Sequence, residues 1–123
     1  MVPVSKVLSE FASSLTYEGL PEEVRTRSKQ LILDLVGNII RARHDAESTP
    51  SVVSAMKRLG YGNGKCTVLG DAESYSAPGA AMINGTLAHS LDFDDTHSAG
   101  SIHSGAPVSY THLRAHETPE HLV

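Results

Sequence analysis

The segment from residue 21 to residue 41 repeats apolar side chains at the period of an α-helix, and this pattern constrains the fold most strongly. One aliphatic stripe and its widened edge are formed by Val24, Leu31, Ile32, Leu35, Val36, Ile39 and Ile40. Pro21, Glu22 and Glu23 suit the first turn of a helix. Arg41 and Arg43 suit its C-terminal end. We therefore expect one long helix with a broad apolar face.

Three shorter segments, residues 4–15, 50–59 and 76–91, show the same helical period. The last of them opens with Ser76 as a capping residue and Pro78 in the first turn. Its small residues would let a neighbouring backbone approach closely: Gly79, Ala80, Ala81, Gly85 and Ala88. Residues 66–69 form a short β-branched run. The sequence thus predicts a mainly α fold with one short extended segment.

Composition excludes several classes of protein. The 123 residues carry a formal net charge of -4 with no basic cluster, so nucleic acid is not an expected partner. Asp34, Gly37 and Asn38 interrupt the apolar runs well short of a membrane span. The lone Cys66 has no cysteine to pair with inside the chain, and we interpret it as a small strand residue. No secretory signal is visible, and we expect a cytoplasmic protein without a membrane partner.

The periodicity ends at Val108. Residues 109–118, SYTHLRAHET, resemble a translated adapter used in transposase-based sequencing libraries. We therefore interpret residues 108–123 as a non-native tail and exclude them from reasoning about the fold. This interpretation removes His112, His116 and His121 from any argument about a metal site.

Residues 91–103, directly behind the fourth helical pattern, gather groups that can move protons. They include Asp92, Asp94, Asp95, Thr96, His97 and His103. Carboxylates are unfavourable at the negative C-terminal end of a helix, and such a break of a local rule indicates function. A continuing helical turn would align His89, Asp92 and Thr96 on one face. A carboxylate could then act as a general base, with a histidine as acid or hydrogen-bond donor.

Structural interpretations of the same residues remain open. Asp94 and Asp95 could be solvated loop carboxylates, or one of them could cap a following helix. His89 could be a buried histidine whose hydrogen bonds are satisfied. His44 lies in a polar connection, and we interpret it as a surface residue.

The same stretch resembles a known family. Residues 84–97 read NGTLAHSLDFDDTH, and residues 103–107 read HSGAP. Upstream, LDLVG at 33–37 and GKCTVLG at 64–70 belong to the same pattern. Together these segments resemble the signature of the MmgE/PrpD family, which includes 2-methylcitrate dehydratase, cis-aconitate decarboxylase and iminodisuccinate epimerase.

The resemblance implies a large helical domain joined to a smaller α+β lid domain, in a homodimer that works without a metal or organic cofactor. Residues 1–107 would be the N-terminal part of the helical domain. The longer protein would be a cofactor-independent lyase of the 2-methylcitrate dehydratase type, acting on a small di- or tricarboxylate. We expect this chain alone to be inactive.

By motif position, Asp92, Thr96 and His103 match the pocket aspartate, threonine and histidine of the decarboxylase branch, and we expect them to be catalytic. A second set would bind substrate: Asp95, His97 and His89. The sequence does not separate dehydratase, decarboxylase and epimerase.

Two other functions compete with this one. A metal-dependent hydrolase or lyase could ligate a divalent ion through Asp92, Asp95, His97 and His103. A helical interaction module would instead leave the acidic cluster exposed and tolerant of mutation.

Overall fold

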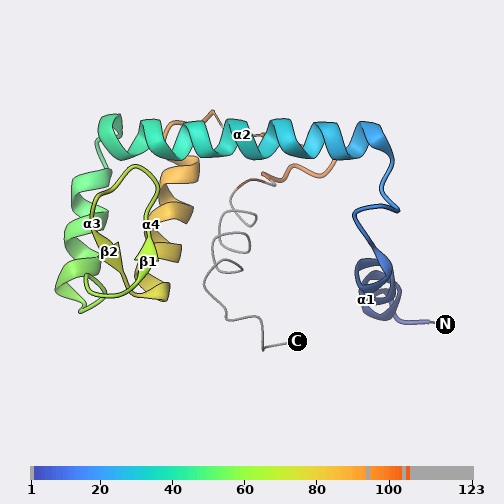
Figure 1. The fold of residues 1–123 in the computed structure, drawn as a ribbon, viewed down its shortest axis with the longest axis horizontal. Coiled ribbons are helices and arrows are strands. Elements are labelled where there is room, and N and C mark those ends of the chain that lie inside the picture. The colour runs from blue at the N-terminus through green and yellow to red at the C-terminus, as the bar shows by residue number, and fades with distance from the viewer. Residues whose placement is uncertain (1, 94, 104, 106–123) are drawn as a thin grey trace. The chain divides into compact units, whose positions relative to one another are not determined.

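The computed structural model describes residues 2–93, 95–103 and 105 (Figure 1). These residues fall into two units, which divide between Gln30 and Leu31. The elements of the described part are α1 (Val4–Ser14), α2 (Glu22–Asp45), α3 (Thr49–Arg58), β1 (Cys66–Thr67), β2 (Ser74–Tyr75) and α4 (Ala77–His89). The prediction of a mainly α fold is therefore confirmed. The interpretation of residues 108–123 as a non-native tail concerns residues outside those described, and it stays a prediction.

The first unit contains α1, a loop and the start of α2. Helix α1 forms where the apolar period predicts it, but no residue of α1 is buried. Its apolar side chains are exposed, with Val4 at 73% and Phe11 at 60%. The loop after α1 is held by Tyr17, whose ring lies 5.3 Å from the Arg25 guanidinium. The apolar period thus predicted helix α1 correctly. In the described residues, however, the apolar face of α1 is exposed.

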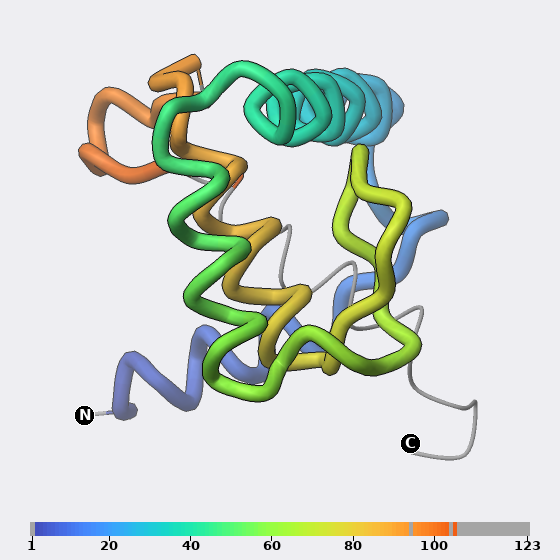
Figure 2. Tube along the Cα trace, turned by 90° about the vertical axis from the view of Figure 1, so that its left-hand side faces the viewer, coloured from blue at the N-terminus to red at the C-terminus, as the bar shows by residue number. Residues whose placement is uncertain are grey.

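The second unit holds the hydrophobic core. Helices α3 and α4 pack side by side, and the two short strands contact α4 (Figures 1 and 2). The core is formed by Leu35, Ile39, Ala42, Ala46, Cys66, Val68, Tyr75, Ala80, Ile83, Leu87 and Ala88. The expected strand at 66–69 is confirmed for its first two residues, which form β1, and Cys66 lies buried in it. Its antiparallel partner β2, with Cys66 opposite Tyr75, has no counterpart in the sequence prediction.

Helix α4 begins as its sequence predicts. The Ser76 hydroxyl accepts a hydrogen bond from the Gly79 N–H at 3.4 Å, so Ser76 caps the helix. A Cβ added at Gly79 would lie 2.8 Å from Tyr61, which confirms a close approach there. A Cβ at Gly85 would meet nothing within 4 Å. The small residues of α4 are therefore packed on one side of the helix and open on the other.

A buried amide joins α4 to the strand β1. Asn84 is fully buried, and its Oδ1 accepts a hydrogen bond from the Leu69 N–H at 3.0 Å. Its Nδ2 donates to the Thr67 carbonyl at the same distance, 3.0 Å. Both backbone groups lie in a segment too short to be satisfied by strand pairing alone. Asn84 thus provides to this segment the hydrogen bonds that a third strand would provide.

A buried carboxylate joins α2 to β2. The fully buried Tyr75 donates its hydroxyl to Asp71 Oδ2 at 2.9 Å, and Arg43 Nε and Nη2 donate to the same oxygen at 2.9 Å. The Glu73 N–H donates to Asp71 Oδ1 at 3.1 Å. Burial alone would raise the pKa of Asp71, but these hydrogen bonds and the Arg43 charge hold it below its ordinary value. Burial and the bond to Asp71 raise the pKa of Tyr75 to about 12.

Of the helices that the structure describes, none combines the length and the apolar character needed to cross a membrane.

Candidate functional site

The candidate site begins where α4 ends. The Ser90 hydroxyl donates to the Thr86 carbonyl at 2.7 Å, and the Asp92 N–H donates to the His89 carbonyl at 3.2 Å. Asp92 has a φ of 55°, in the left-handed region that short polar residues tolerate best after glycine. The helical path therefore stops before Asp92. The expected alignment of His89, Asp92 and Thr96 along a continuing turn is wrong, because the left-handed residue turns the backbone away from the helix axis.

Helix α2 supports the loop that follows. Asn38 Nδ2 donates to the Phe93 carbonyl at 3.2 Å and lies 3.4 Å from Asp34 Oδ2. A Cβ added at Gly105 would lie 3.0 Å from Leu35, so the far end of the loop packs on the same helix. The loop is thus held at both ends by residues within one helical turn of each other.

His103 and Thr96 come together at the centre of this loop. His103 Nδ1 lies 3.3 Å from Thr96 Oγ1 and 3.2 Å from the Asp95 carbonyl oxygen. A carbonyl oxygen only accepts hydrogen bonds, so the contact with Asp95 requires a hydrogen on Nδ1. These contacts of Nδ1 orient the imidazole ring against the loop backbone.

His89 contributes a second imidazole to the same place. Its ring centroid lies 5.1 Å from that of His103, with the ring planes tilted by 49°. His89 stands in the last turn of α4 and is exposed, as is His103. The interpretation of His89 as a buried histidine is therefore wrong. A cationic imidazole is favoured by the negative end of a helix, so this position suits contact with an anion.

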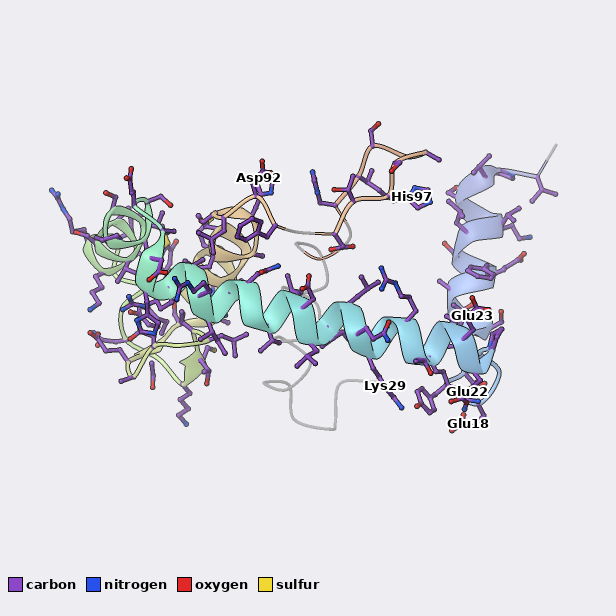
Figure 3. All side chains as sticks on the ribbon, turned by 90° about the horizontal axis from the view of Figure 1, so that it is seen from above. Glu18, Glu22, Glu23, Lys29, Asp92 and His97 are labelled. Atoms are coloured by element: carbon purple, nitrogen blue, oxygen red, sulfur yellow. The ribbon has the colours of Figure 1, made fainter. Side chains whose placement is uncertain are left out.

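Asp95 and His97 contact the backbone of their own loop. Asp95 Oδ1 accepts from the Gly105 N–H at 2.9 Å, and His97 Nδ1 accepts from the Gly100 N–H at 3.0 Å. His97 also pairs with Ile102 in a single antiparallel bridge. Figure 3 shows Asp92 near the end of α4 and His97 farther along the loop, with the two side chains apart. These contacts hold the loop together, and the bond to Gly105 gives Asp95 a structural role, whereas the interpretation of Asp95 as a purely solvated carboxylate is wrong.

An open hollow of about 390 Å³ adjoins the His89 imidazole. It lies along the uncovered side of α4 and is lined by Ala81, Met82, Gly85, Thr86, His89 and Ser90. The hollow combines small and apolar side chains with two hydroxyls and an imidazole. Both hydroxyls donate to backbone carbonyls of α4, Thr86 to Met82 and Ser90 to Thr86.

The site brings together some of the predicted residues and not others. His103, Thr96 and His89 lie close together, whereas Asp94 lies outside the described residues. Among residues 2–93, 95–103 and 105, no group of three or more His, Cys, Asp or Glu is placed to hold a metal ion. The four side chains of the alternative metal site are thus not assembled, since those of Asp95 and His97 bind backbone N–H groups instead.

Sequence reasoning missed Asn38, which supports the loop from α2. In the sequence, Asn38 interrupts an apolar stripe and follows Asp34 by four residues. An amide next to a carboxylate on one side of a helix is only a weak indication of a functional role. Nothing in its local pattern points to a loop that lies more than fifty residues away in the chain.

The fold and the site define part of a mainly helical domain in which a loop rich in carboxylates and imidazoles follows a helix end. A model of the MmgE/PrpD N-terminal domain matches residues 6–113. The chain belongs to the MmgE/PrpD family, as the resemblance in its sequence indicates.

Curated relatives are fungal. The chain is 28% identical over 105 residues to the cis-aconitate decarboxylase-like protein oryM of Aspergillus oryzae (strain ATCC 42149 / RIB 40), covering 84% of this chain and 21% of that protein. It is 29% identical over 105 residues to a cis-aconitate decarboxylase of Aspergillus terreus, covering 85% of this chain and 21% of that protein. The chain thus spans about a fifth of the length of these relatives. No solved structure matches it.

Proposed function

We propose that this chain is part of a cofactor-independent lyase that transfers a proton at a carbon next to a carboxylate of a small di- or tricarboxylate. The observation that carries the proposal is the contact of His103 Nδ1 with Thr96 and the Asp95 carbonyl, in a member of this family. An exposed imidazole whose ring is oriented by such contacts is suited to proton transfer, which supports the proposal. The relatives named as cis-aconitate decarboxylases make decarboxylation the first reaction to test.

Each catalytic residue has a proposed role. Asp92 acts as the general base, His103 as the general acid, and Thr96 orients His103. In a decarboxylation, the bond to the leaving carboxylate breaks and its electron pair takes up a proton at carbon. In a dehydration, the base removes a proton next to a carboxylate while the acid protonates the leaving hydroxyl. The decarboxylation thus needs a proton donor, whereas the dehydration needs a base and an acid on opposite sides of the substrate.

Two neighbouring imidazoles support the proposed substrate class, and one of them, His89, lines the hollow. His89 and His103 together offer two imidazoles to one carboxylate of the substrate. The loop itself carries three aspartates and no lysine or arginine, so further cationic anchors must come from other parts of the longer enzyme. Substrate contacts of Asp95 and His97 stay predictions. The enzyme would be a cytoplasmic homodimer without metal or organic cofactor, as the family resemblance implies.

The test uses the longer protein encoded by the uninterrupted gene, because this chain spans only a fifth of its relatives. Wild type should release carbon dioxide from cis-aconitate or dehydrate 2-methylcitrate. Asp92→Asn and His103→Ala should each lower kcat at least about a hundredfold, the scale of losing an acid or base. His44→Ala, which changes an exposed histidine of α2, is the matched control and should leave kcat unchanged.

The outcomes separate the competing functions. Near-normal turnover of both site variants would refute the assignment of these residues. Activity that a chelator abolishes and a divalent metal restores would support the metal-dependent alternative instead.

A further inference from the structure

Asn38 uses both hydrogens of its amide to connect α2 with the candidate loop. Its Nδ2 lies 3.2 Å from the Phe93 carbonyl and 3.4 Å from Asp34 Oδ2. Both partners only accept hydrogen bonds, so the nitrogen of the amide, and not its oxygen, must face them. Asp34, one helical turn earlier on α2, thus orients Asn38, and Asn38 in turn binds the loop.

The bonded carbonyl belongs to the residue that follows Asp92. On its other side, the Asp92 N–H donates to the His89 carbonyl at 3.2 Å. Asp92 is therefore held between the end of α4 and the side of α2. Its φ of 55° is strained for a residue with a Cβ, and such a conformation persists only where the surroundings enforce it.

We infer that Asn38 is a positioning residue, which keeps Asp92 in the left-handed conformation by binding the Phe93 carbonyl. It does not touch the reacting atoms, and it acts through the backbone that carries the proposed base. The conformational part of this inference stands on the described contacts alone. The catalytic part rests on the proposed function.

The first experiment measures the backbone of Asp92 by NMR in this chain. A residue with positive φ shows a strong intraresidue NOE between its amide and α protons, and wild type should show it at Asp92. Asn38→Asp keeps the shape of the side chain but turns an oxygen toward two oxygens, so this NOE should weaken to the level of extended residues. Asn38→Ala, which removes both donors without adding charge, should give the same change.

Two further variants isolate the cause. Asn63→Asp makes the same substitution in the exposed turn before β1, and it should leave the Asp92 NOE intact. The double variant Asp34→Asn/Asn38→Asp removes the repulsion between the two carboxylates but still presents an oxygen to the Phe93 carbonyl. Its NOE should stay weak. A strong NOE in Asn38→Ala, or its recovery in the double variant, would overturn the inference.

The second experiment measures kinetics in the longer protein. Asn38→Ala should lower kcat about tenfold to a hundredfold, the scale of misplacing a reacting group, with KM and the thermal midpoint little changed. Asn63→Ala should leave all three unchanged. A weakened NOE with an unchanged kcat would overturn the catalytic part of the inference. If the wild-type enzyme converts no polycarboxylate, the proposed function fails, and the NMR result still decides whether Asn38 holds the loop.

Discussion

Replacing Asn84 by leucine tests how strongly the fold depends on one buried amide. Leucine has nearly the same size, but it leaves the Leu69 N–H and the Thr67 carbonyl, each 3.0 Å from the amide, without this partner. An unsatisfied buried polar group costs about 1–3 kcal/mol, so two of them cost about 4 kcal/mol. Burying the leucine side chain stabilises the folded state by about 2 kcal/mol, which offsets part of this cost. We therefore expect Asn84→Leu to lower the free energy of unfolding by about 2 kcal/mol.

The variant Asn84→Asp separates hydrogen bonding from size. A protonated aspartate can still accept from Leu69 and donate to Thr67, whereas an ionised one turns a charged oxygen toward the Thr67 carbonyl. Complete burial at this position raises the pKa of the introduced carboxyl. A raised folded pKa gives stability that is present below the unfolded value of about 3.9 and is lost as the pH rises. The deficit against wild type should therefore be small in acid and grow toward neutral pH.

Urea unfolding of this chain, followed by far-UV circular dichroism at several pH values, measures both effects. Asn63→Leu and Asn63→Asp are the matched controls, because Asn63 is exposed. They should stay within about 0.5 kcal/mol of wild type. The reasoning is refuted if Asn84→Leu also stays within this range, or if the deficit of Asn84→Asp is the same at every pH.

Four more predictions concern the core and α4. The depressed pKa of Asp71 contributes stability above about pH 4 that is lost as the pH falls further, so urea midpoints should drop in acid. Tyr75→Phe removes one bond to that carboxylate and should cost about 1.5–3 kcal/mol at neutral pH; no loss there would contradict the described contact. Gly85→Ala should stabilise this chain by about 0.5–1 kcal/mol in thermal unfolding, because its Cβ meets no neighbour. Gly79→Ala should destabilise it through the contact with Tyr61, and equal effects of the two alanines would argue against this packing.

The helices could be predicted because their signals are local. Residues 50–59 and 76–91 carry an apolar period, capping residues and prolines, and the structure ends these helices within two residues of the prediction. Helix α2 continues to Asp45, four residues beyond the expected end, because polar residues can extend a helix on its exposed side. Strand β2 could not be predicted, since Ser74–Tyr75 has no pattern of its own and forms only by pairing with β1. The apolar period of α1 likewise predicts a helix, but it does not indicate which residues would pack against the apolar face of that helix.

In the candidate site, too, local features could be predicted from the sequence, whereas features that depend on distant residues could not. The residue types in 91–103 indicated proton transfer, but the path of the backbone depends on one left-handed residue that no periodicity signals. The two asparagines that fix the surroundings have ordinary local patterns. Asn38 entered the sequence argument only as a break in an apolar run, and Asn84 only as the first residue of the family signature. In the structure, each amide binds backbone groups of a segment that its own helix does not contain. A side-chain amide can donate and accept at once, so it can join a helix to irregular backbone where no sheet is present. The role of such an amide is recognisable only when the position of the distant backbone is known. The sequence of this chain therefore predicted the residue types of the candidate site, but it did not predict the asparagines that hold the neighbouring backbone.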